Sequence, residues 1–286
     1  MAMKIPEDEI LKAVEKSGYL MEQEIATTLE EMNFNVKTNA SFEDEEEGKS
    51  REIDILAPQE LFRDEEKKLT IYTVLICECK NNQNPFVFIK RKKNKYDLNP
   101  APIEYLFPVE KYWKHTSKDG YNFVSDIPPF QFLELKKSHY YYKTEDKAVQ
   151  FCKIIRKGKN WEAMHDNIYD GIFYPLIKAL NSQIKYVKKF KREWKHIYLF
   201  FPMVVLNSEI YAIQSYDSVK KPVLVDSVSF VREIKSKTIN GQYLVDFITK
   251  EKLKNHINNK ILKFCNSIVE DYKSNPNKYL ERDIKE

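Results

Sequence analysis

The pattern of apolar residues predicts a central strand that ends in charged residues. From Leu69 to Cys77 the chain is apolar or β-branched on both alternating faces, which is typical of a strand covered on two sides. Glu78 and Lys80 follow directly, and residues two apart on a strand point the same way. We therefore expect a carboxylate and an ammonium group side by side at the end of a buried strand, where desolvation is unfavourable.

Residues 18–36 predict a helix that leads into another strand. On a helical wheel of roughly 100° per residue, one apolar arc is formed by Met21, Ile25, Leu29 and Met32. Glu22 falls inside this arc, whereas the neighbouring acidic residues Glu24, Glu30 and Glu31 fall outside it. Two readings of Glu22 stay open: a carboxylate aimed at a site, or a boundary residue that reaches water.

Two later segments have helical periodicity. Residues 166–194 predict a second core helix, with Pro175 near a break or kink. Residues 249–272 predict an amphipathic helix that packs on the core or on a partner. Between the first strands and the second helix, residues 91–165 contain several prolines and no sustained period. We interpret them as loops and short helices.

Three later segments have the composition of strands. Residues 197–206 and 210–213 predict a hairpin that completes the sheet. Pro202 implies that this part of the hairpin lies at an edge or a bulge, because proline cannot donate a ladder hydrogen bond. Residues 222–230 predict another strand.

These segments predict an α/β fold with a central mixed sheet flanked by helices. We expect a single catalytic domain with additions, divided into the first part of a core at 1–90, an insertion at 91–165, the rest of the core at 166–235 and a C-terminal helical extension at 236–286.

Composition excludes several classes of protein. The 286 residues carry a net charge of +4, which neither demands nor excludes nucleic acid. No apolar run has the length of a membrane span, and the first residues lack the apolar segment of a signal peptide. Four cysteines without framework spacing are typical of a reducing cytoplasm. With six glycines and no glycine-rich phosphate loop, a nucleotide-driven motor is not expected.

Asp54 and the sequence Glu78-Cys79-Lys80 together form a known signature. An acidic residue, a spacer and Glu-x-Lys on the next strand resemble the PD-(D/E)XK, or restriction-endonuclease-like, nuclease superfamily, and its Mrr-like members in particular. Ile53 stands where the motif has proline. The resemblance covers about the first ninety residues and implies an αβββαβ core. It also implies that Glu22, on the first helix, is a third carboxylate of the site.

The chemistry of phosphodiester hydrolysis explains these residue types. A divalent ion lowers the pKa of the attacking water and neutralises developing charge, and Mg²⁺ prefers hard oxygen ligands. The expected cofactor is therefore Mg²⁺ or Mn²⁺, with Asp54, Glu78 and the Cys79 backbone carbonyl as ligands and Glu22 acting through a water or on a second ion. Neighbouring carboxylates favour the charged form of Lys80, so it is expected to orient the attacking hydroxide and stabilise phosphorane charge rather than act as a base.

A basic run follows the Glu-x-Lys strand and is expected to contact nucleic-acid phosphates. It begins ten residues beyond Lys80 and contains Lys90, Arg91, Lys92 and Lys93. A solvated face is the competing interpretation of this run.

The expected function is a metal-dependent nuclease that acts on DNA rather than RNA, in defence against foreign DNA by analogy with the family. A homodimer is left open. The alternative is a noncatalytic nucleic-acid-binding or assembly protein that retains the fold, and a third interpretation is a structural protein with charged strand ends. Cys77 and Cys79 are better read as small core residues than as a zinc site, because neither Cys152 nor Cys265 completes a ligand spacing.

Overall fold

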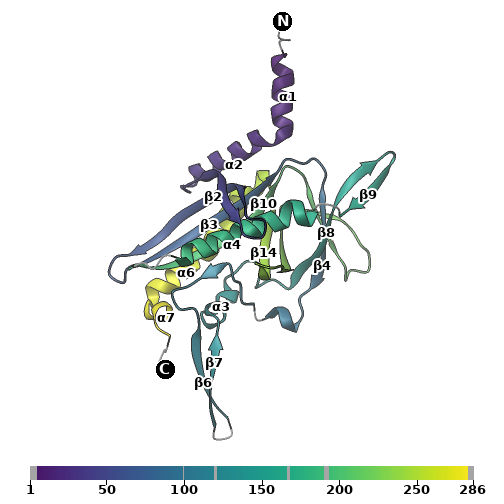
Figure 1. The fold of residues 1–286 in the computed structure, drawn as a ribbon. Coiled ribbons are helices and arrows are strands. Elements are labelled where there is room, and N and C mark those ends of the chain that lie inside the picture. The colour runs from purple at the N-terminus through teal and green to yellow at the C-terminus, as the bar shows by residue number, and fades with distance from the viewer. Residues whose placement is uncertain (1–4, 99, 119–120, 166–167, 190–192, 283–286) are drawn as a thin grey trace.

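A large mixed β-sheet with helices on both faces forms the body of the protein (Figure 1). The computed structural model describes residues 5–98, 100–118, 121–165, 168–189 and 193–282. Along the main path of the sheet, the strands described are, in order, β1 (Lys37–Asp44), β2 (Lys49–Asp64), β3 (Leu69–Lys80), β10 (Lys195–Leu206), β14 (Asn240–Thr249), β13 (Ser227–Lys235), β8 (Asp146–Lys157), β4 (Phe86–Lys92), β11 (Ile210–Gln214) and β12 (Val223–Val225). Off this path, β5 (Tyr105–Leu106) pairs with β10 and β9 (Asn160–Met164) pairs with β8, while β6 (Tyr112–Lys118) and β7 (Tyr121–Ile127) form a separate hairpin.

Strand β3 is the central strand that its sequence predicts. It pairs antiparallel with β2 and parallel with β10. Leu75 and Cys77 belong to one apolar cluster, and Val74 and Ile76 belong to another on the opposite face. Both faces of β3 are therefore buried, which explains why the run from Leu69 to Cys77 does not alternate with polar residues.

Helices cover these two faces. The helices described are α1 (Glu7–Ser17), α2 (Tyr19–Glu31), α3 (Pro129–Phe132), α4 (Tyr174–Lys189), α5 (Leu253–His256), α6 (Lys263–Ser274) and α7 (Asn277–Leu280). Helix α2 buries Ile25 and Leu29 in the same cluster as Cys77, whereas α4 buries Leu176 and Ile177 in the cluster of Val74. None of the helices described combines the length and the hydrophobicity that a membrane span requires.

The helix predicted within residues 18–36 is confirmed as α2, and the helix predicted at 166–194 is present in a shorter form as α4. Residues 166–167 and 190–192 of that prediction lie outside the described residues. Helix α2 ends before Asn33, whose φ of 63° turns the chain toward β1. Helix α4 is preceded by a π-helical turn at Tyr169–Phe173, and Pro175 lies in its first turn, where a missing N–H is tolerated.

An acidic run, residues 43–47, is bound to α4 through part of its carboxylates. Asp44 is 1% exposed, and Lys178 donates to its Oδ2 at 2.6 Å while Arg51 Nε donates to the same oxygen at 2.7 Å. Burial opposes ionisation of Asp44, but these two cations hold its pKa below the ordinary value. The run therefore fastens the β1–β2 turn to α4.

The prediction that residues 91–165 form only loops and short helices is wrong. This segment contains β5 to β9, and β8 pairs with β4 inside the main sheet. Most of β8 is half-buried, with Ala148 the buried exception, so neither face of the strand shows clear alternation. The prolines mark its connections, not the absence of strands.

The predicted hairpin of 197–206 and 210–213 is also wrong. Strand β10 lies between β3 and β14, whereas β11 pairs with β4 and β12. The Phe200 N–H donates to the Glu104 carbonyl, on the edge of β10 that pairs first with β5 and then with β14. The backbone nitrogen of Pro202 points to the same edge, since it is two residues further along the strand. It lies beyond the end of β5 and before β14 pairing begins at Met203, so the missing N–H interrupts no ladder hydrogen bond. The predicted strand at 222–230 is divided between β12 and β13.

Residues 236–286 are not a purely helical extension. They begin with β14, which pairs parallel with β10 at the centre of the sheet. The helical part, interrupted by a π-helical stretch at Ile257–Leu262, buries Ile261, Phe264 and Ile268 in the α2-side cluster. The predicted amphipathic helix therefore packs on the core.

Candidate active site

Asp54 lies where strands β2 and β3 separate. Their antiparallel pairing runs from Asp64 opposite Leu69 to Ile55 opposite Cys77 and stops there. Ile53 belongs to the α4-side cluster and Ile55 to the α2-side cluster, so β2 exchanges its two faces at Asp54. In place of a backbone acceptor, Asp54 Oδ2 accepts the Cys79 N–H at 2.6 Å. This hydrogen bond fixes the carboxylate beside the Glu-x-Lys segment.

Glu78 and Lys80 form an ion pair at the end of β3. Lys80 Nζ donates to Glu78 Oε1 at 2.5 Å, and the two side chains are 29% and 11% exposed. The prediction that they lie side by side on one face is confirmed. Cys77 and Cys79 point to the opposite face, into the α2-side cluster.

Both carboxyl groups in this small volume have a raised pKa, and burial is the first cause for each. Burial, and then the charge of Asp54, raise the pKa of Glu78 to about 7, against the lowering effect of Lys80. Burial also raises the pKa of Asp54, although the Cys79 N–H and Lys80 act in the other direction. One ammonium group thus does not fully compensate two carboxylates, and the site favours additional positive charge.

Glu22, half-buried on helix α2, lies close enough to Asp54 and Lys80 for their charges to act on its carboxyl group. Its pKa is raised, first by burial and then by Asp54, while Lys80 lowers it. Gly18, which precedes α2 with a φ of 89°, allows the approach, because a Cβ there would lie 3.2 Å from Asn81 Cβ and 3.9 Å from Glu22 Oε1. Glu22 therefore stays a predicted third carboxylate of the site.

The donor set fits a hard divalent cation. In the part of the chain that the structure describes, no three or more His, Cys, Asp or Glu side chains are grouped closely enough to hold an ion by themselves. Mg²⁺ is commonly held by one or two carboxylates with waters completing its shell, and Asp54 and Glu78 supply that number. The Cys79 carbonyl, which follows Glu78 directly, stays a predicted third ligand.

The predicted phosphate-binding run does not pair with these carboxylates. Lys92 pairs with Glu145 at 3.8 Å, and Lys93 Nζ donates to the carbonyl oxygens of Tyr141 and Thr144 at 2.5 and 2.8 Å. Burial lowers the pKa of Lys93 to about 8. Lys90 is half-buried and its pKa is lowered by burial, so Arg91 and Lys92 are the exposed members of the run.

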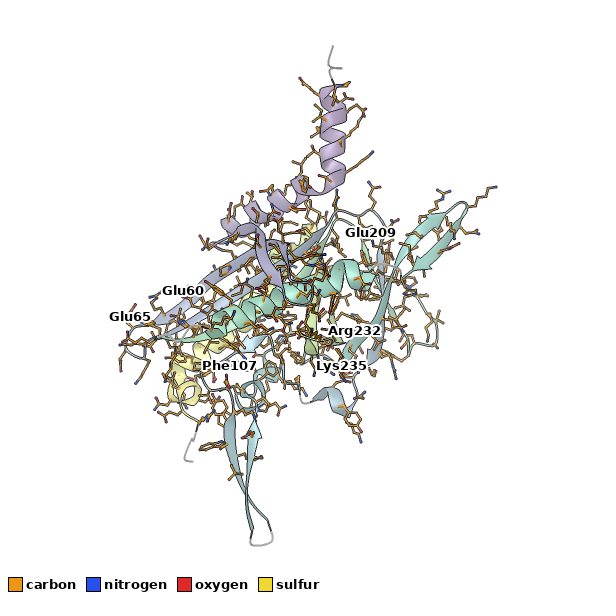
Figure 2. The ribbon with its side chains drawn as sticks, viewed as in Figure 1. Glu60, Glu65, Phe107, Glu209, Arg232 and Lys235 are labelled. Carbon is orange, nitrogen blue, oxygen red and sulfur yellow. The ribbon has the colours of Figure 1, made fainter. Side chains whose placement is uncertain are left out.

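Sequence reasoning missed the loop and strand that flank Lys80. Asn81 Nδ2 donates to the Glu15 carbonyl at 2.5 Å and its Oδ1 accepts from Asn207 Nδ2 at 2.8 Å. Asn207 N–H donates to the Lys80 carbonyl at 3.1 Å. Glu209, labelled in Figure 2, continues this turn, and its backbone carbonyl accepts the Phe86 N–H at 3.0 Å. The signal that was available is the run of asparagines directly after Lys80.

No protein-family model matches this chain, and neither a curated protein nor a solved structure matches it. The chemistry of the site therefore has to be inferred from its own residues.

Proposed function

We propose that the protein is a metal-dependent nuclease of the PD-(D/E)XK type that hydrolyses phosphodiester bonds in DNA. The observation that carries the proposal is the meeting of Asp54, Glu78 and Lys80 where β2 and β3 separate, with the pKa of both carboxyl groups raised. Such a cluster is costly to bury without a ligand and is typical of functional sites.

The order of the elements around the site supports the finer assignment of the fold. Helix α2 is followed by the antiparallel strands β1, β2 and β3, and α4 is followed by β10, which lies parallel to β3. This is the αβββαβ order that the family resemblance implies, with β4 to β9 inserted before α4.

Each residue of the cluster has a role that its position favours. A bound Mg²⁺ would supply a lowered water pKa and charge neutralisation at the phosphate. Asp54 and Glu78 would hold the ion, with Asp54 kept in place by the Cys79 N–H. Lys80, held at 2.5 Å by Glu78, would orient the attacking water and stabilise the charge that develops on phosphorus-bound oxygens. Glu22 would bind the ion through a water.

Cleavage assays test the proposal. Supercoiled plasmid, linear duplex, single-stranded DNA and RNA would be incubated with Mg²⁺ or Mn²⁺ and with the wild type, Asp54→Asn, Lys80→Met or Glu52→Gln. Glu52 is an exposed carboxylate two residues from Asp54 and serves as the matched control. We expect Asp54→Asn and Lys80→Met to lose at least about 100-fold in rate, and Glu52→Gln to cut like the wild type.

Two results would contradict the proposal. Cleavage that survives Asp54→Asn would place the activity elsewhere or in a contaminant. Absence of cleavage by the wild type, together with Mg²⁺ binding that Asp54→Ala does not weaken, would favour a noncatalytic protein.

A further inference from the structure

Lys153 lies close enough to Lys80 for the charge of Lys80 to act on its ammonium group, although it is 73 residues further along the chain. It stands opposite Phe86 in the antiparallel β4–β8 pair, and its Nζ lies 5.7 Å from the centroid of the Phe86 ring. The next residue, Ile154, donates its N–H to the Pro85 carbonyl at 2.9 Å. Strand β8 is thereby fixed against the loop that begins directly after Lys80.

The other two lysines of β8 form ion pairs with carboxylates, whereas Lys153 forms none with the described residues. Lys147 pairs with Asp97 at 2.8 Å and Lys157 pairs with Glu162 at 3.6 Å. Among the residues described, no carboxylate lies within ion-pair distance of Lys153, which is half-buried. Burial lowers its pKa, and the nearby charge of Lys80 lowers it further.

A half-buried ammonium group that is exposed to the charge of a second one, and has no counter-ion among the described residues, is electrostatically unfavourable in the free protein. An anion would relieve it. In the adjoining loop, Asn82 Oδ1 accepts the Asn84 N–H at 2.8 Å, which fixes the turn between Lys80 and β4. The surroundings of Lys153 thus have an excess of positive charge that an anionic oxygen ligand would compensate.

We infer that Lys153 binds a phosphate of the nucleic-acid backbone, next to the phosphate that lies at Asp54 and Glu78. This inference rests on the proposed function for the identity of the ligand. Contacts to phosphate fix the register of a nucleic acid on a protein and carry no base sequence. Lys153 is therefore a positioning residue for the scissile bond, supplied by β8 in the segment inserted between β3 and α4.

Binding measured without metal tests Lys153 separately from catalysis. Fluorescence anisotropy of a labelled DNA duplex in EDTA, over a series of salt concentrations, would compare the wild type, Lys153→Gln, Lys153→Arg and Lys157→Gln. Lys157 is exposed on the same strand and gives the same loss of charge. We expect Lys153→Gln to weaken binding and to reduce the slope of log K against log salt by roughly 0.9, Lys153→Arg to restore both, and Lys157→Gln to change neither.

Cleavage provides the second readout. In active protein, Lys153→Gln is expected to raise KM more than it lowers kcat, with a thermal midpoint equal to that of Lys153→Arg. If no variant cuts, the proposed nuclease function fails, while the metal-free salt slope still decides whether Lys153 binds the backbone.

Two results would overturn the inference. One is a salt slope for Lys153→Gln equal to that of the wild type or of Lys157→Gln. The other is a pair of observations: inorganic phosphate raises the thermal midpoint of the wild type but not of Lys153→Gln, and the two proteins bind DNA equally. That result would assign the site to free phosphate.

Discussion

At the scale of single residues, Glu78 is the position where local structural preference conflicts with the proposed function. It follows a run of apolar residues on β3 and is 8% exposed, in a place where a hydrophobic side chain would be easier to bury. The raised pKa of Glu78 reflects the unfavourable burial of its carboxylate. Natural proteins keep such unfavourable groups mainly where activity needs them.

The first prediction concerns the affinity for Mg²⁺. Because the pKa of Glu78 is about 7 in the metal-free protein, the ion must displace a proton below that pH, and affinity should fall by about tenfold from pH 8 to pH 6. Isothermal titration calorimetry of the wild type and of Glu78→Gln would measure this. The variant should bind at least about tenfold more weakly at pH 8. An affinity independent of pH, or an equal loss in Glu52→Gln, would contradict the assignment.

The second prediction concerns Glu104, a buried carboxyl group directly before β5. Leu244 N–H donates to its Oε1 at 2.5 Å, but in the described structure its buried Oε2 has no partner. Burial raises its pKa from 4.5 to about 7, so the folded protein holds a proton that the unfolded chain releases in this interval. The free energy of unfolding therefore falls as pH rises from about 4.5 to 7 and is not reduced further by this group above pH 7.

Replacement of Glu104 by Gln should reduce that decrease by about 2 to 3 kcal/mol. Urea unfolding at pH 5 and at pH 8 would measure it, with Glu110→Gln as the control because Glu110 is exposed. The prediction fails if the wild type and Glu104→Gln lose the same stability between the two pH values.

The sequence alone predicts the candidate residues whose position has a local cause. Glu78 and Lys80 share a face because they are two apart on a strand, and Glu22 lies on an apolar arc. Lys153 could not be found in this way, because its position follows from the pairing of β4 with β8, across roughly 65 residues of chain. The pairing of distant strands has no signature in a single sequence.

At the scale of elements, helices and strands with a strong apolar periodicity are predictable from the sequence, whereas half-buried strands are not. Strand β3 and helices α2 and α4 have one dominant apolar pattern each, and all three were predicted. Strand β8 is mostly half-buried, so its pattern matched no template. The exchange of faces at Asp54 was also invisible, because Ile53 and Ile55 both read as ordinary inward residues of one face.

The third prediction concerns α1, which extends away from the body of the protein (Figure 1). None of its residues is buried, so it gains no stability from apolar burial. A chain that begins at Gly18 should melt within about 2 °C of the full chain, since roughly 1 kcal/mol shifts the midpoint by 2–4 °C in proteins of this size. Leu29 on α2 is fully buried, so Leu29→Ala should lower the free energy of unfolding by about 2–5 kcal/mol. A midpoint for the shortened chain as low as that of Leu29→Ala would show that α1 is a stabilising element.

At the scale of the whole molecule, segments from the N-terminal and C-terminal parts of the chain pack together in one sheet and one core. Strand β10 is held between β3, from the first third of the sequence, and β14, from the last fifth. The α2-side cluster likewise combines Ile25 and Leu29 with Phe264 and Ile268. Division of the sequence into a core and a C-terminal extension therefore failed for a physical reason: the last segment supplies a central strand and one layer of the core.

The fourth prediction follows from this interleaving. A chain of residues 1–235 lacks β14 and the helices after it, which exposes the edge of β10 and removes buried residues such as Phe247 and Phe264 from both apolar clusters. We expect this chain to have no cooperative thermal transition and to bind a hydrophobic dye, because a sheet without its central neighbour cannot bury its apolar faces. The chain 18–286, shortened at the other end, is the control and should unfold sharply. A sharp transition of 1–235 with a native circular dichroism spectrum would mean that β14 and α6 are additions to a core that is stable without them.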